Sequence, residues 1–84
     1  MVILYELNDT VWFPEADCRM GFTKVKILSA AVTNTEMLDY RKQRIEIEFM
    51  NGTKATMLNS KVYPSKRAAA QAVQRMVENY LLED

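Results

Sequence analysis

Residues 45–58 decide the fold, and they read IEIEFMNGTKATML. Apolar and acidic side chains alternate up to Phe49, and Asn51 with Gly52 forms a strong turn signal before the chain returns. A two-residue loop would put Lys54 opposite Phe49 on the apolar face. A three-residue loop with Gly52 in the left-handed position keeps that face apolar, so we predict this bulged turn.

The bulged turn also brings opposite charges together across the two strands. Glu48 lies beside Lys54 on the polar face, and such a pair stabilises a sheet by a few tenths to about 1 kcal/mol. The other predicted pairs are Phe49 with Thr53, Ile47 with Ala55, Ile45 with Met57 and Glu46 with Thr56.

The earlier part of the chain contains further strand signals. Residues 2–5 and 10–13 are short segments rich in β-branched and aromatic residues, and Pro14 is expected to end the second of them. A loop is predicted over residues 15–21. The longest strand candidate covers residues 22–32.

Within this longest candidate, the apolar positions change phase after Ile27. A phase change inside one strand indicates a bulge or a sharp bend, which allows a short sheet to curl into a small barrel. Residues 33–42 are predicted to form an exposed connection, or to extend the flanking strands into a long hairpin.

An amphipathic helix is predicted over residues 65–82. Ser65 is a typical N-cap residue, and Pro64 favours extended backbone before it. An apolar stripe with spacings of three and four is expected to lie on the sheet: Ala69, Ala72, Val73, Met76, Val77, Tyr80 and Leu81. The predicted fold is therefore α+β, a single domain over residues 1–84 with a strongly bent antiparallel sheet of four or five strands in about residues 1–63.

The composition argues against several classes of protein. The 84 residues include no histidine and one cysteine, Cys18, so an intramolecular disulfide is excluded and the commonest metal ligand is missing. We find no catalytic constellation, and predict a protein that is not an enzyme and has no metal or cofactor. With neither an export leader nor a membrane-spanning run expected, a cytoplasmic location follows.

The equal numbers of acidic and basic residues conceal a segregation along the chain. Residues 1–18 contain acidic residues and no basic one, whereas residues 19–75 contain all eleven lysines and arginines. Either the terminal segments balance the basic middle within the molecule, or the middle is a functional surface.

Basic residues at the predicted helix N-terminus form one candidate site. Lys66 and Arg67 lie in the first turn, with Lys61 shortly before, although the helix dipole disfavours cations there. This arrangement suits a phosphate or another anion. The alternative is a solvated surface whose charges are screened.

Several motifs together resemble small phage and prophage proteins of the SH3-like barrel type. The resemblance rests on the aromatic strand, the basic strand, the Gly-containing turn and the capped, alanine-bearing helix: residues 8–13, 24–27, 45–53 and 62–69. It implies a small, non-enzymatic accessory protein and suggests a host factor as its target. The chain departs from the family pattern where Lys66 and Arg67 replace the usual acidic residues after the cap.

The resemblance leads to a non-catalytic module that binds a protein partner. Barrels of this type commonly bind through loops and aromatic ledges, which selects Trp12, Tyr40, Arg41, Lys42 and Arg44 as partner-binding residues. Trp12 is equally suited to a core position.

The alternative function is nucleic-acid binding by the basic middle segment, against which the isoelectric point of about 6.2 argues. Its candidate residues are Lys24, Lys26, Arg41, Lys42, Arg44 and Lys54. The sequence is compatible with a monomer and with a homodimer as the oligomeric state. Six methionines would suit an adaptable interface.

Overall fold

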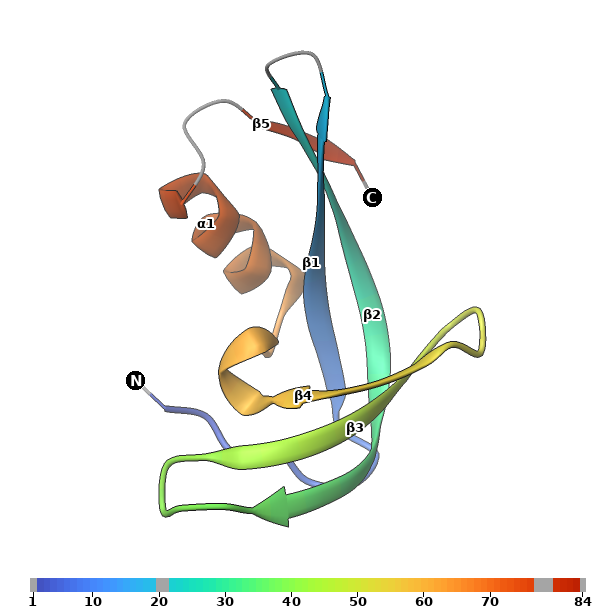
Figure 1. Ribbon diagram of the computed structural model, residues 1–84, viewed down its shortest axis with the longest axis vertical. Coiled ribbons are helices and arrows are strands. Elements are labelled where there is room, and N and C mark those ends of the chain that lie inside the picture. Colours follow the sequence, from blue (N-terminus) through green and yellow to red (C-terminus); the bar gives the residue numbers. More distant parts are fainter. Residues whose placement is uncertain (1, 20–21, 77–79, 84) are drawn as a thin grey trace.

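The computed structural model describes residues 2–19, 22–76 and 80–83, and the side-chain surroundings of residues 2–16 and 24–75. Figure 1 shows a tall β-hairpin crossed near its base by a second hairpin, with a helix alongside. The elements are β1 (Thr10–Arg19), β2 (Phe22–Met37), β3 (Gln43–Phe49), β4 (Lys54–Leu58), the 3-10 helix η1 (Asn59–Lys61), α1 (Lys66–Met76) and β5 (Tyr80–Glu83).

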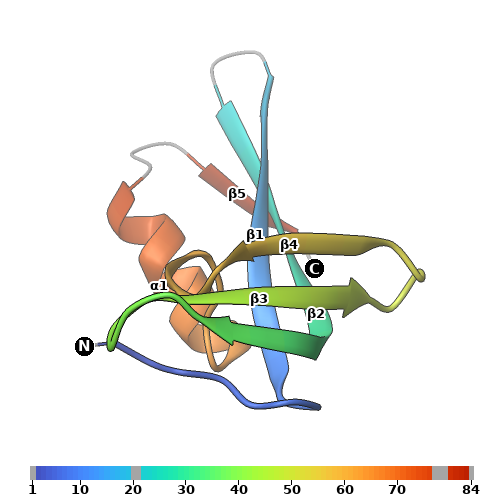
Figure 2. The ribbon, with the colours of Figure 1, turned by 60° about the horizontal axis from the view of Figure 1, so that its bottom comes forward.

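The strands form one sheet in the order β1-β2-β3-β4, with antiparallel neighbours, and β5 pairs in parallel with β2. The predicted α+β class is confirmed. Figure 2 shows β3 and β4 crossing in front of β1 at a steep angle. No ladder joins β1 to β4 in the described part of the chain, so the sheet is open and a closed barrel is not formed.

One short link brings the chain back from β4 to the free edge of β1. After η1, the backbone of Tyr63 exchanges two hydrogen bonds with that of Trp12, each of 2.9 Å. This isolated bridge holds the start of α1 against β1.

The β3–β4 hairpin has the predicted register. Ile47 lies opposite Ala55, and Glu48 lies opposite Lys54. The turn closes through Phe49 N–H to Thr53 O at 2.8 Å and Gly52 N–H to Phe49 O at 2.9 Å, and Gly52 has a φ of 88°. The bulged turn is therefore confirmed, and its left-handed position is occupied by glycine.

Pro14 does not end β1, and the loop predicted for residues 15–21 is wrong over residues 15–19, which continue the strand. The backbone groups of Trp12 point away from β2, because both bond to Tyr63. Backbone direction repeats every two residues in an antiparallel ladder, so the nitrogen of Pro14 also points away from β2. A proline on the open side of an edge strand removes no ladder hydrogen bond.

Residues 2–5 form no strand, contrary to the prediction, and buried amides hold this segment instead. The Gln43 side chain accepts from Tyr5 N–H at 2.8 Å and donates to Tyr5 O at 2.6 Å. Asn59 accepts from Gln43 N–H at 3.1 Å and donates to Ile3 O at 3.0 Å. The two side chains satisfy backbone groups that a ladder would otherwise satisfy.

The phase change in β2 corresponds to two apolar clusters and not to a bulge. Val25 and Ile27 pack with Ala69 and Val73 of α1. Further along β2, a second cluster includes Tyr5, Val11, Ala30, Val32, Ile45, Ile47 and Val62. The pairing with β1 runs unbroken through the change of phase, while the one register shift lies between Val32 and Asn34 in the ladder to β3.

Residues 33–42 extend the flanking strands into a long hairpin, which is the second of the two alternatives predicted for them. β2 continues to Met37, and the connection to β3 is a short turn at the end of a long hairpin.

Helix α1 begins as predicted and ends earlier. Ser65 Oγ accepts from Ala68 N–H at 3.0 Å, which confirms the N-cap, and Ala69 and Val73 are buried. The helix ends at Met76, and residues 80–83 form β5, so the prediction of helix up to residue 82 is wrong there. Val77 lies outside the described residues. An apolar spacing alone does not distinguish a last helical turn from a segment that an open edge of β2 binds as a strand.

We expect Gly52→Ala to lower the free energy of unfolding by about 1 to 2 kcal/mol, because a Cβ is disfavoured at positive φ. No atom lies within 4 Å of the position that this Cβ would take, so the loss reports backbone strain alone. Urea unfolding measures the change. Thr53→Ala in the same exposed turn is the control, with an expected change below about 0.5 kcal/mol.

We expect Gln43→Met to lower the free energy of unfolding by about 2 kcal/mol or more. The substitution leaves the N–H and C=O of Tyr5 without partners, and each buried unpaired group costs about 1–3 kcal/mol. Gln71→Met makes the same replacement on the exposed face of α1, where a change below about 0.5 kcal/mol is expected. Equal losses in the two variants would contradict the role of the Gln43 amide.

Candidate functional site

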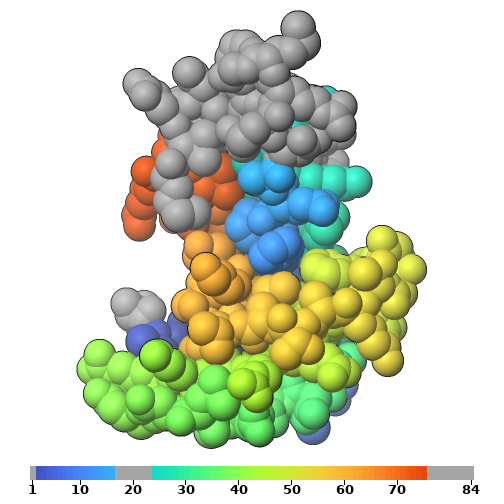
Figure 3. All heavy atoms as spheres, viewed as in Figure 1, coloured from blue at the N-terminus to red at the C-terminus, as the bar shows by residue number. Residues whose placement is uncertain are grey.

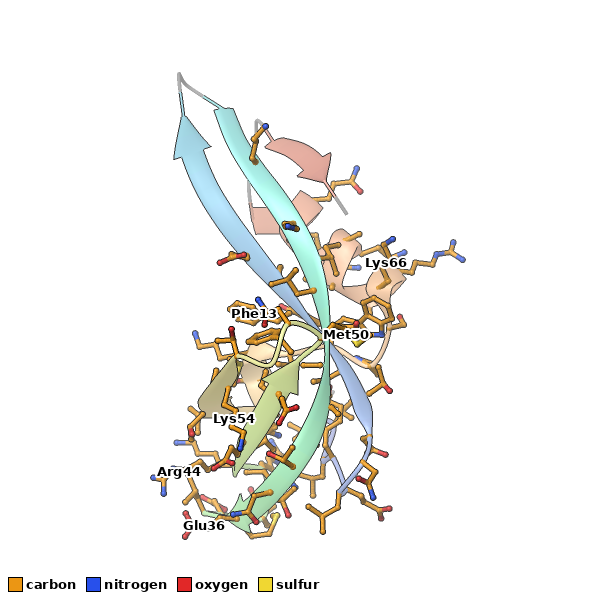
Figure 4. The ribbon with its side chains drawn as sticks, turned by 90° about the vertical axis from the view of Figure 1, so that its right-hand side faces the viewer. Phe13, Glu36, Arg44, Met50, Lys54 and Lys66 are labelled. Atoms are coloured by element: carbon orange, nitrogen blue, oxygen red, sulfur yellow. The ribbon has the colours of Figure 1, made fainter. Side chains whose placement is uncertain are left out.

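A groove of about 340 Å³ lies between the β3–β4 turn and the start of α1, and we call it the turn–helix groove. In Figure 4, Met50 of the turn and Lys66 of α1 lie close to each other near the middle of the molecule. The lining residues are Trp12, Lys26, Ile27, Leu28, Ser29, Phe49, Met50, Asn51 and Lys66.

The floor of the turn–helix groove is apolar and rests on packed residues. Ile27 is buried, while Trp12, Leu28 and Phe49 are half-buried. The Phe49 ring contacts Phe13 of β1 with 6.1 Å between ring centroids and 60° between planes. Met50 at the rim is 88% exposed, and contact of its apolar side chain with water is unfavourable. An apolar partner would remove this surface from water.

Both charged residues that line the turn–helix groove are cations. Lys26 comes from β2 and Lys66 from the first turn of α1. Glu15 of β1 and Glu83 of β5 occupy the ladder positions opposite Lys26. The groove therefore combines an apolar floor with a positive rim.

The β2–β3 hairpin end, residues 36–44, carries most of the partner-binding residues that the sequence predicts. Tyr40 is 76% exposed, and the Arg41 guanidinium lies 5.2 Å from the centre of its ring. Arg44 forms an exposed ion pair with Glu36 at 2.6 Å. The turn itself closes through Leu38 N–H to Lys42 O at 2.9 Å.

The structure separates the predicted site residues into two groups. Tyr40, Arg41, Lys42 and Arg44 lie together at the hairpin end, whereas Trp12 lies at the turn–helix groove and packs towards α1. Among the predicted anion-binding residues, Lys66 lines the groove. Lys61 ends η1, Arg67 lies in the first turn of α1, and both are exposed.

Sequence reasoning missed the part of the groove that Leu28 and Phe49 provide, and it singled out Met50 only as one of the methionines suited to an interface. Met50 is next to the predicted turn, and an apolar side chain at a turn is the one local signal that points to it. Its proximity to Trp12 and Lys66 depends on how the two hairpins cross, which no local pattern reveals.

The basic residues proposed for nucleic acid do not form one continuous surface. Arg41, Lys42 and Arg44 belong to the hairpin end, and Lys54 lies at the other end of β3, opposite Glu48. In Figure 4, Arg44 and Lys54 occupy different levels of the lower hairpin. Acidic neighbours lower the potential that a phosphate backbone would meet.

A second cavity of about 200 Å³ lies between the N-terminal segment and η1, next to Tyr5 and Val62. The Tyr5 hydroxyl donates to Val62 O at 3.3 Å. Burial raises the pKa of Tyr5 above 10.0, and the charges of Asp9 and Tyr63 raise it further. A buried phenol that keeps its proton supports packing here and gives no general base at neutral pH.

The described residues offer no group of three or more His, Cys, Asp or Glu side chains for a metal ion. Within the same residues, no helix has the length and apolar character to cross a membrane. Their buried side-chain polar atoms all have hydrogen-bond partners.

Comparison of the chain with protein-family models, curated proteins and solved structures finds no match. The resemblance to phage proteins of the SH3-like type stays a prediction. Over the described residues, the fold defines a small α+β domain with an open, strongly bent, mainly antiparallel sheet and one α-helix.

We expect the free energy of unfolding to fall as the pH rises above 10, and part of this fall to disappear in Tyr5→Phe. The folded-state pKa of Tyr5 is raised, so the unfolded chain releases the phenol proton first. The contribution of Tyr5 is complete below about pH 10 and is lost as the pH passes through the folded-state pKa.

Urea unfolding at a series of pH values measures this effect. Tyr40→Phe, at an exposed tyrosine, is the matched control and is expected to follow the wild-type curve. Parallel curves for wild type and Tyr5→Phe would show that Tyr5 does not contribute.

Proposed function

We propose that this protein is a non-catalytic binding module that recognises a protein partner in the cytoplasm, and that it is an accessory protein of the phage SH3-like type. The turn–helix groove carries the proposal. It joins an apolar floor, a nearly fully exposed methionine and a positive rim in one concave surface. Pockets of this composition are typical binding sites, and exposed methionine adapts to the shape of a partner.

The connection after β4 supports the SH3-like part of the proposal. After β4, the chain leads through η1 back to β1. There it forms one bridge, Trp12 to Tyr63, where a closed barrel would have a full ladder. In Figure 3, atoms of β3 and β4 cover the lower part of the near face, and α1 flanks β1 above them. This arrangement leaves the β2–β3 and β3–β4 turns available to a partner.

The β2–β3 hairpin end provides a second surface for the same function. Met37, Leu38 and Tyr40 are 52%, 44% and 76% exposed, beside Arg41 and Lys42. The hydrogen-bonded turn holds them in place, which lowers the entropy lost on binding. Protein recognition is favoured over nucleic-acid binding because both surfaces are apolar as well as basic.

Affinity capture from a host lysate, with and without nuclease, tests the proposal. Met50→Glu and Met37→Glu form a matched pair, because each replaces an exposed methionine with a charge, one at the groove and one at the hairpin end. We expect a stoichiometric protein that survives nuclease, is lost at least tenfold with Met50→Glu and is reduced by a smaller factor with Met37→Glu, because the groove is the main surface and the hairpin end the second. Thermal unfolding of both variants should match that of the wild type.

Two results would contradict the proposal. Loss of all captured material on nuclease treatment would favour nucleic acid, whose binding would also fall steeply with salt. Equal capture by wild type and both variants would show that neither surface binds the partner.

A further inference from the structure

The turn–helix groove runs along an edge of β2. Its lining includes four consecutive residues, 26–29. Neighbouring side chains on a strand point to opposite faces of the sheet. A cavity that touches four in succession therefore opens at the strand edge, where the backbone of β2 is also within reach of a ligand.

This edge of β2 is the place where two ladders stop short of each other. β5 pairs with residues 23–26, and the ladder to β3 begins at Ala30. Both lie on the side of β2 away from β1. In the described part of the chain, residues 27–29 have no paired strand on this side, and the turn–helix groove occupies the interval.

The backbone of Ser29 points into this interval. Ser29 lies opposite Trp12, whose N–H and C=O both bond to Tyr63 and so point away from β2. Trp12 and Ser29 are therefore a non-hydrogen-bonded pair, in which the N–H and C=O of each residue point away from the partner strand. The N–H and C=O of Ser29 therefore both point to this side of β2. The C=O closes the Ala30–Phe49 pair at the end of the ladder to β3, because the backbone groups of Phe49 bond within the β3–β4 hairpin, so the N–H is the group left for a ligand.

We infer that the turn–helix groove binds an extended segment of a protein partner that carries one large apolar side chain next to an acidic residue. The apolar side chain lies on Leu28 and Phe49, a peptide carbonyl accepts from Ser29 N–H, and the carboxylate lies beside Lys26 and Lys66. Charge complementarity selects the acidic residue, because lysines are the charged residues of the lining. The inference rests on the proposed function and names the ligand class.

The size of the groove favours an extended segment over a helix. Its volume of about 340 Å³ lies near the lower limit of ligand pockets, about 300–1,000 Å³. One side chain and its neighbouring backbone fit this space, whereas a bound helix would need a longer apolar groove with several anchors. Addition of extended backbone to an exposed strand edge is an established way of binding a peptide.

Selection of random heptapeptides displayed on phage, with the full chain as target, tests the inference. Trp12 is the one tryptophan of the chain and lines the groove, so its fluorescence reports binding of selected peptides that lack tryptophan. We expect enriched peptides with Asp or Glu adjacent to Leu, Ile or Phe. Their affinity should fall as salt is raised, since the rim charges are exposed.

Variants then separate the three contacts. Ser29→Pro removes the N–H that faces the open edge, where proline costs no ladder bond, and we expect at least tenfold weaker peptide binding. Lys66→Glu reverses a rim charge, and we again expect at least a tenfold loss. Arg75→Glu reverses a charge at the other end of α1, away from the groove, and is the matched control, which should leave peptide affinity unchanged within twofold.

The outcomes distinguish the inference from the proposed function. Absence of enriched peptides, or enrichment without acidic residues, would overturn the inference, as would unchanged peptide binding in Lys66→Glu. If partner capture still depended on Met50 in that case, the groove would bind a folded surface and the proposed function would stand. If Ser29→Pro failed to fold, Lys66→Glu and the salt dependence would decide alone.

Discussion

The structure depends on one strand that changes its buried face. β2 turns Val25 and Ile27 towards α1, and three residues further along it turns Ala30 and Val32 into the second cluster. Because β2 pairs with β1, β3 and β5, this change sets the directions of every other strand. Ile27 and Ala30 are three residues apart, so alternation alone places them on opposite faces of the sheet while the ladder to β1 continues without interruption. A single sheet thereby contributes side chains to two apolar clusters of this small domain.

The two clusters have a cost, which is an incompletely paired sheet. β3 and β5 cover different parts of the same edge of β2 and leave residues 27–29 between them. At the N-terminus, the Gln43 and Asn59 amides satisfy the backbone of an unpaired segment. At the turn–helix groove, open backbone lies beside apolar surface. Unpaired strand edges readily accept another chain, which makes this position suitable for recognition.

The candidate site was only partly predictable. Aromatic Trp12 and basic Lys66 are conspicuous in the sequence, and both line the turn–helix groove. Tyr40 and the nearby cations form a local set that any hairpin would keep together. Met50 and Leu28 carry no comparable signal, because their importance comes from the crossing of two hairpins. A site formed by residues far apart in the sequence depends on long-range geometry that neither composition nor spacing specifies.

The sequence alone determined the elements whose physics is local. Alternation and a glycine at positive φ set the register of the β3–β4 hairpin, and the Ser65 hydroxyl set the start of α1. Only the tertiary structure decided where Pro14 is tolerated, why residues 2–5 are not a strand, and that residues 80–83 pair with β2. Those outcomes depend on which backbone groups face an unpaired edge, and an edge exists only after distant strands have met.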